Sequence, residues 1–237
     1  MGFWSSVGSA ISSACSAVGS AISGAFGSVS STFSNAMSNI GSVLSTASTI
    51  LSALSVAMPQ IAKIAAIVDI ALTILNLQDK NENVEEIGEK VLQGYEMDIK
   101  PADFSTYEEY ITAIRNVKLD PEKSEKFNLG EKLAAGITVQ AWGMEEKYGQ
   151  GSSDFLVHIL NDAPKIAKGE GYFTESRVQN ILDKIKNVAD VAKYFSNKLG
   201  PDDGNRVEQE LVQIEKGLNP NKTVEDIYKE LDQHRKD

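Results

Sequence analysis

The chain has 237 residues, a formal net charge of −10 at pH 7 and a single cysteine. This acidic balance excludes a basic surface that binds nucleic acid by neutralising phosphates, and it gives little attraction to anionic lipid head groups. An intramolecular disulfide is excluded as well, so we expect Cys15 to act as a small hydrophobic side chain.

The charged residues are distributed very unevenly along the chain. All 23 Lys and Arg residues and all 33 Asp and Glu residues lie at or after Lys63. We therefore predict two regions in an all-α protein. Residues 1–78, largely uncharged and rich in Ser, Gly and Ala, would form long helices that interact with a membrane. Residues 79–237 would form an acidic helical bundle, and they are numerous enough to bury a core.

The uncharged N-terminal segment carries an apolar stripe with an eleven-residue period. Large apolar side chains recur at steps of four, three and four, about 3.67 residues per turn, which keeps them on one face of a long helix. The opposite face carries Ser, Gly, Thr and Asn, where a helix in water would carry Lys and Glu. We predict that the stripe faces a membrane or other helices. It consists of Trp4, Val7, Ile11, Cys15, Val18, Ile22, Phe26, Val29, Phe33, Met37, Ile40 and Leu44.

A single straight helix over this segment is too long to span a bilayer. Residues 5–57 would extend about 80 Å at 1.5 Å per residue, whereas the hydrocarbon core is about 30 Å thick. The helix could lie in the interface, break at glycines into spanning pieces, or pack in a protein bundle. Small residues on one face allow close helix packing in lipid, which favours the membrane arrangements.

Two further apolar segments flank Pro59. Residues 43–58 and 60–77 are each at the lower limit of length for a membrane-spanning helix. Proline interrupts a continuous helix because it lacks an N–H donor and crowds the preceding turn. We therefore expect a kinked or hairpin pair of helices around Pro59.

Lys63, Asp69, Thr73 and Asn76 of the second of these segments are candidates for a polar path. Lys63 and Asp69 are its only charged residues, and helical spacing places Asp69, Thr73 and Asn76 on one face. In lipid, these four residues would mark a polar path through a pore. Alternatively, residues 60–77 form an amphipathic helix of the folded domain, with Lys63 and Asp69 at its solvent edge.

Apolar spacing and capping signals predict a series of short helices after residue 80. The expected segments are 83–97; 107–117 after a capping box from Ser105 to Glu108; a helix that begins at Pro121 after Asp120; 129–148 ended by Gly149; 153–161; 175–199; 206–216; and 224–235 capped by Thr223.

The acidic region contains no motif of an enzyme or of a metal site. His158 lies in an apolar stretch and His234 in a charged tail, positions that favour structural roles over ligation. Residues 202–205 are acidic but lack the ligand spacing of a calcium loop, so we predict a turn between helices. Glu145 and Glu146 could supply a general acid for glycoside cleavage. We otherwise expect no catalytic residue, metal or cofactor.

This layout resembles small pore-forming effectors of bacterial type VI secretion, which are delivered by contractile injection machines. The resemblance is carried mainly by residues 1–77, and residues 1–20 lack the basic start and continuous apolar core of a cleavable signal peptide. It implies a secreted, non-enzymatic toxin that is soluble before delivery, inserts its N-terminal helices, self-associates and depolarises a target-cell membrane. It also implies a secretion-tube or chaperone partner and an immunity protein.

Two other functions remain open. The eleven-residue repeat could coat a lipid surface or bind a secretion-tube protein without forming a pore. The N-terminal region could also be a delivery segment for a secreted, muramidase-like enzyme.

Overall fold

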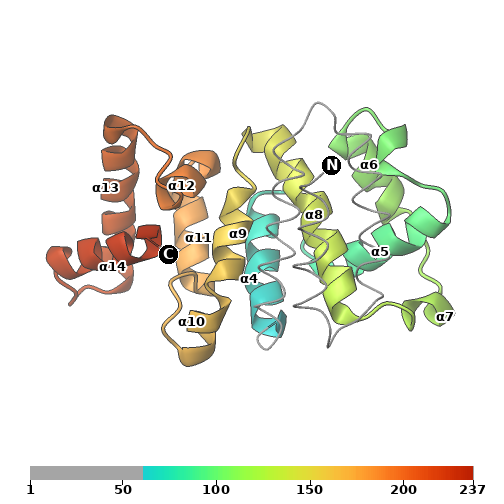
Figure 1. Cartoon of the computed structure of the whole chain (residues 1–237), viewed down its shortest axis with the longest axis horizontal. Helices are drawn as coiled ribbons and strands as arrows, with labels where there is room; N and C mark the ends of the chain where they lie inside the picture. The colour runs from blue at the N-terminus through green and yellow to red at the C-terminus, as the bar shows by residue number, and fades with distance from the viewer. Residues whose placement is uncertain (1–60, 237) are drawn as a thin grey trace, which may run out of the picture.

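The computed structural model describes residues 61–236, and every regular element within them is a helix (Figure 1). The all-α prediction is therefore confirmed for this part of the chain. The apolar stripe, Cys15 and Pro59 lie outside the described residues. In chain order the elements are α4 (Ile61–Ile74), α5 (Val84–Glu96), the 3₁₀ turn η2 (Pro101–Asp103), α6 (Tyr107–Arg115), α7 (Pro121–Ser124), α8 (Leu129–Tyr148), α9 (Asp154–Asn161), α10 (Ala163–Lys168), α11 (Glu175–Lys184), α12 (Val188–Phe195), α13 (Pro201–Leu218) and α14 (Val224–Lys236).

Local capping chemistry sets the ends of α8 as the sequence predicts. Asn128 Oδ1 accepts a hydrogen bond from the Glu131 N–H at 3.0 Å, and Glu131 Oε2 accepts one from the Asn128 N–H at 2.8 Å. This reciprocal pair is a capping box. Gly149 follows the helix with a φ of 88°, a conformation that favours glycine. The predicted helices over 83–97, 153–161 and 224–235 are confirmed to within one or two residues.

Helix α6 begins at Tyr107 as predicted, but its capping box lies one residue later than predicted. Thr106 Oγ1 accepts a hydrogen bond from the Glu109 N–H at 3.2 Å, and Glu109 Oε2 accepts one from the Ser105 N–H at 2.9 Å. The N-cap is therefore Thr106 and not Ser105. Two candidate pairs, Ser105 with Glu108 and Thr106 with Glu109, overlap in the sequence, and their spacing alone does not distinguish them.

The prediction of one helix over residues 175–199 is wrong, because the chain breaks there into α11 and α12. Ile185 has an extended backbone, and Asn187 Oδ1 caps α12 through the Asp190 N–H at 3.4 Å. Ile185 and Val188 are both buried, so the apolar spacing continues across the break and conceals it.

Residues 202–205 are also placed differently from the prediction, since they form the first turns of α13 rather than a loop. Pro201 occupies the first helical turn, where a missing N–H has no cost. Helix α13 begins at Pro201, five residues earlier than the expected start at residue 206.

Helix α4 lies at the centre of the domain, between α9 and α8 (Figure 1). It packs against α11 and α9 on one side and against α5 and α8 on the other. Ile64, Val68 and Leu72 are at most 1 % exposed and belong to the same apolar core as the later helices. Residues 61–77, which the charge pattern assigns to the N-terminal region, therefore share a core with the acidic domain.

The closest helix contact joins α5 and α8 at two glycines. A Cβ atom on Gly136 would lie 2.0 Å from the backbone oxygen of Val84, and one on Gly88 would lie 1.6 Å from the backbone oxygen of Lys132. The two backbones touch at this crossing, so any side chain would push the helices apart.

We predict that Gly136→Ala destabilises the protein by about 1–3 kcal/mol or more, because the added methyl group meets backbone rather than a flexible side chain. The matched control is Gly204→Ala in α13, where the nearest atom to the new Cβ is 3.9 Å away. Alanine has the higher helix propensity, so the control should gain up to about 1 kcal/mol. Urea unfolding measures both, and equal effects would contradict the crossing geometry.

Candidate functional site: the C-terminal end of α4

The C-terminal end of α4 leads into the segment that joins it to α5. The carbonyl groups at the end of a helix lack partners in the next turn and must be satisfied elsewhere, and in α4 the N–H groups of Leu75, Asn76 and Leu77 bind those of the last turn. The carbonyl groups of these three residues, just after the helix, in turn require donors from other elements. Here two side chains of α8 supply hydrogen bonds. The Tyr148 hydroxyl donates to Leu75 O at 2.6 Å, and Lys147 Nζ donates to Leu75 O at 3.2 Å and to Asn76 O at 3.1 Å.

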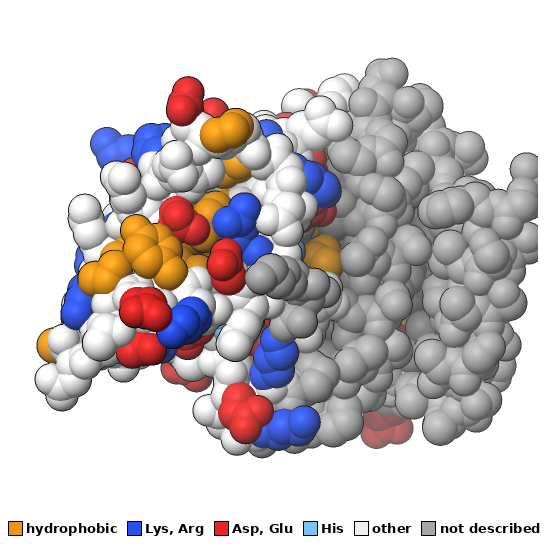
Figure 2. Space-filling model, turned by 60° about the vertical axis from the view of Figure 1, so that its left-hand side comes forward, with side chains coloured by type: hydrophobic (Ala, Val, Ile, Leu, Met, Phe, Trp, Pro, Cys, Tyr) orange, Lys and Arg blue, Asp and Glu red, His pale blue; other side chains and the backbone are white. Residues whose placement is uncertain are grey.

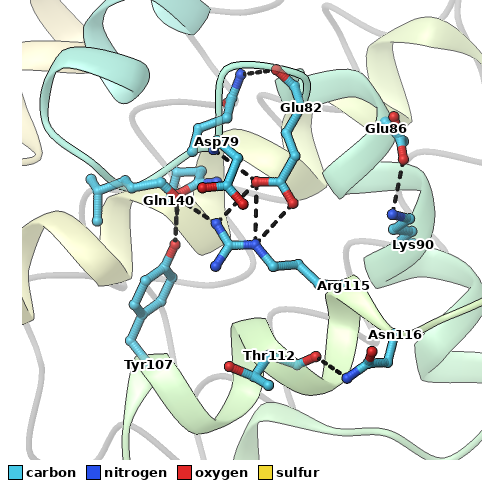
Figure 3. A network of polar contacts seen from close by, with 11 residues as sticks. Asp79, Glu82, Glu86, Lys90, Tyr107, Thr112, Arg115, Asn116 and Gln140 are labelled. Carbon is cyan, nitrogen blue, oxygen red and sulfur yellow. Dashed lines mark hydrogen bonds and ion pairs between the residues drawn. The ribbon is translucent and has the colours of Figure 1, made fainter.

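Two side chains of α6 satisfy the next carbonyl group (Figure 3). Arg115 Nη2 donates to Leu77 O at 3.2 Å. The Tyr107 hydroxyl is shared between Leu77 O at 3.3 Å and Gln140 Oε1 at 2.7 Å. We call Tyr107, Arg115, Lys147 and Tyr148 the α4 clamp. Two of its members are cations, which the negative end of the helix dipole also favours.

Arg115 is held in place by a bidentate ion pair with Glu82 (Figure 3). The Nε–Oε1 and Nη2–Oε2 distances are both 2.9 Å. Burial alone would raise the pKa of Glu82, but hydrogen bonds from Arg115 and the Asp79 N–H, with the Arg115 charge, lower it below its ordinary value. The carboxylate therefore stays ionised and keeps the guanidinium directed at α4.

Asp69 joins α4 to the start of α5 through hydrogen bonds. Its Oδ1 accepts hydrogen bonds from Gln78 Nε2 at 2.9 Å and from the Val84 N–H at 2.7 Å, at the first residue of α5. Burial raises the pKa of Asp69, and the two hydrogen bonds oppose that shift. In this conformation the Asp69 carboxylate is therefore engaged within the fold.

The structure does not bring the four residues of the predicted polar path together on one face. Lys63 is exposed near the start of α4, while Asp69 and Thr73 are half-buried on it. Asn76 lies beyond the helix end with a φ of 50°, so the prediction that it extends the face of Asp69 and Thr73 is wrong. None of the helices in residues 61–236 combines the length and apolarity needed to cross a bilayer, and α4 has 14 residues.

The carboxylates considered for glycoside cleavage bind backbone N–H groups. Glu145 accepts hydrogen bonds from the N–H groups of Gly151 and Ser153, each at 2.9 Å, and Glu146 accepts one from the Tyr107 N–H at 3.0 Å. These contacts fix the loop after α8 and the start of α6. No cluster of three side chains suited to a metal ion occurs among residues 61–236.

The far end of the domain, formed by α13 and α14, has a mixed surface. Figure 2 shows apolar side chains there separated by acidic and basic ones. Val224 and Tyr228, one turn apart on α14, are 44 % and 39 % exposed. The charges interrupt the apolar area, so this face differs from the uniform stripe of the N-terminal segment.

The clamp could not be identified from the sequence. Its members come from α6 and α8, about 30 to 70 positions after the carbonyl groups that they satisfy. Positive residues near a helix end are a local signal, but these lie on other helices.

No family model, curated protein or solved structure matches the chain.

We predict that Glu82→Gln lowers the free energy of unfolding by about 1–3 kcal/mol at pH 7, as expected for loss of a charged hydrogen-bond pair. Because the folded-state pKa of Glu82 is lowered, its stabilisation is present above the ordinary glutamate pKa and is lost as the pH falls through the folded value. The difference between variant and wild type should therefore shrink at pH 3.5.

The control for this experiment is Glu225→Gln, because the Glu225 side chain is 79 % exposed beside Lys229. It should change stability by less than about 0.5 kcal/mol at either pH. A Glu82 variant whose deficit is the same at pH 7 and pH 3.5 would show that its charge does not hold the clamp.

Proposed function

We propose that the protein is a membrane-targeting bacterial toxin whose N-terminal segment inserts into a target membrane and forms an ion-conducting pore. One observation carries the proposal. Residues 1–62 contain no charged side chain, and their sequence pattern has an apolar stripe with an eleven-residue period opposite a face of Ser, Gly, Thr and Asn. Such a segment exposes apolar surface in water and can bury it by entering lipid or by packing against other copies of itself.

The polar face suits a pore wall because its side chains enter a bilayer at modest cost. Ser and Thr hydroxyls can bond to carbonyl groups one turn back in their own helix. Small side chains also let helices approach closely in lipid. When several copies associate, the stripe faces lipid and the hydroxyl face surrounds water.

The fold supports insertion of residues before Ile61 rather than of α4. Six side chains of α4 are buried, and each large one contributes about 1.5–3 kcal/mol relative to exposure. Withdrawal of α4 would also leave the clamp donors without their acceptors. Residues 61–236 would thus remain folded at the membrane surface as an anchor for the inserted segment.

This arrangement leaves the proposed lumen without fixed charge. Lys63 is the first charged residue and lies at the exposed start of α4. Side-chain charge sets ion preference in many pores, so a neutral lumen should pass small monovalent ions with weak selectivity. Delivery on a secretion-tube or chaperone protein and neutralisation by an immunity protein belong to the same proposal.

The test is dye release and ion current with protein-free vesicles and planar bilayers. We predict that Ile22→Asp with Phe26→Asp reduces release more than tenfold, since each charge costs about 2.5–3.5 kcal/mol at the centre of an inserted helix. The control, Ser20→Asp with Ser31→Asp, changes the charge equally on or beside the polar face and should reduce release far less.

The outcomes separate the candidate functions. Equal losses in the two double variants would show that the stripe is not the lipid-facing surface. Vesicle binding by the wild-type chain without release or current would favour a protein that coats or adheres to lipid. No binding at all would contradict the proposal.

A further inference from the structure

The connection between α10 and α11 inserts two aromatic side chains into the core. Tyr172 and Phe173 are 1 % and 3 % exposed, and their ring centroids are 5.1 Å apart. Phe195 of α12 contacts both, at 5.4 Å and 5.2 Å. We call Tyr172 and Phe173 the aromatic plug, because they fill the space among α9, α12 and α14.

Both histidines of the chain contact this plug, although they are 76 positions apart in the sequence. His158 of α9 lies 6.4 Å from the Phe173 ring and 5.8 Å from the Phe195 ring. His234 of α14 lies 4.7 Å from the Tyr172 ring. The plug is therefore flanked by two imidazoles from different helices.

The backbone of the plug is fixed on both sides. Asp162, at the end of α9, accepts a hydrogen bond from the Phe173 N–H at 2.8 Å. Arg177 donates to Tyr172 O and pairs with the buried Glu215, with an Nη2–Oε2 distance of 2.9 Å. The plug thus has little freedom to move away from an imidazole that gains a charge.

The surroundings of His158 oppose its protonation. Its Nε2 lies 3.0 Å from Ser196 Oγ, while the rings of Phe173 and Phe195 occupy two other sides. Burial lowers the pKa of His158, and Lys198 adds to this, whereas Asp154 and the carbonyl of Ala192 oppose it. The loss of hydration outweighs the favourable partners.

His234 is surrounded by charges of both signs. Burial lowers its pKa, and Lys165 and Arg177 act in the same direction. Asp162 and Glu230 favour the protonated form but do not reverse the shift. The folded protein therefore favours a neutral imidazole on both sides of the plug.

We propose that His158, His234 and the aromatic plug form an acid-sensitive latch, in which protonation of the imidazoles loosens the packing of α9, α12 and α14 around Tyr172 and Phe173. Burial lowers the pKa of both imidazoles below the ordinary histidine value of about 6.5 in the folded state. As the pH falls below that value, the unfolded state binds more protons than the folded state, so the free energy of unfolding decreases.

Carboxylates also contribute to the pH dependence of stability. The stabilisation from Glu82 is lost only below the ordinary glutamate pKa. Burial raises the pKa of Asp162, so its protonation favours the folded state and works against the latch at lower pH. The contribution of the histidines is therefore the part of the difference between pH 7.5 and pH 5.5 that their replacement removes.

The latch also has a consequence for α4. Helix α9 contacts α4 directly, and α11, which follows the plug, has the most extensive packing on α4. Loosening at the plug would therefore weaken the packing of α4, the helix that follows the N-terminal segment. That consequence depends on the proposed function, whereas the latch itself does not.

The experiment is urea unfolding of the full-length chain at pH 7.5 and pH 5.5, without vesicles. The wild-type midpoint should fall with pH, His158→Gln and His234→Gln should each lose part of that fall, and the double variant should show none. Gln233→His in the double variant is the control, because an exposed imidazole on α14 should not restore the pH dependence.

Imidazole titration of the wild-type chain by NMR gives an independent measurement that does not depend on the variants folding. The latch requires both rings to titrate below the ordinary histidine value. Titration of either ring at or above it would overturn the proposal, as would a double variant that retains the full wild-type fall. Because vesicles are absent, failure here would leave the proposed membrane function unaffected.

Discussion

The described fold depends on the burial of α4 between two groups of helices. One side of α4 packs on α9 and α11, and the other on α5 and α8. The carbonyl groups just after its C-terminal end accept hydrogen bonds from side chains of α6 and α8. The helix nearest to the uncharged segment is therefore also the helix that joins the two parts of the domain.

This position constrains how a membrane activity could work. A pore built from α4 would require the loss of the central core and the release of the clamp, whereas a pore built from the preceding residues would require neither. The polar residues Asp69 and Thr73 look suited to a lumen when the sequence is considered alone. In the fold, Asp69 instead accepts hydrogen bonds that join α4 to α5.

The parts of the fold that the sequence predicts well depend on local chemistry. The ends of α8 follow from Asn128 and Gly149, and the start of α14 follows from Thr223, because capping groups lie within a few residues of the groups they satisfy. The break between α11 and α12 was missed because Ile185 and Val188 continue the apolar spacing across it.

The candidate site was predicted less well, because it consists of long-range contacts. Arg115 and Tyr148 carry no local sign that they bind the end of α4. The pairing of both histidines with one aromatic plug likewise arises only when α9 and α14 meet in space. The charge pattern indicates a division near residue 78. However, a lack of charged side chains shows only that a helix avoids water, and a short apolar helix such as α4 is equally suited to a protein core.

The most direct test of this account is hydrogen exchange of the full-length chain bound to vesicles, followed in peptides that cover α4. The account predicts that amides between Ile64 and Leu72 stay as protected on the vesicle as they are in solution, because α4 remains in the core. Loss of protection across α4 on membrane binding, with α5 and α8 still protected, would show that α4 leaves the core and would contradict the account.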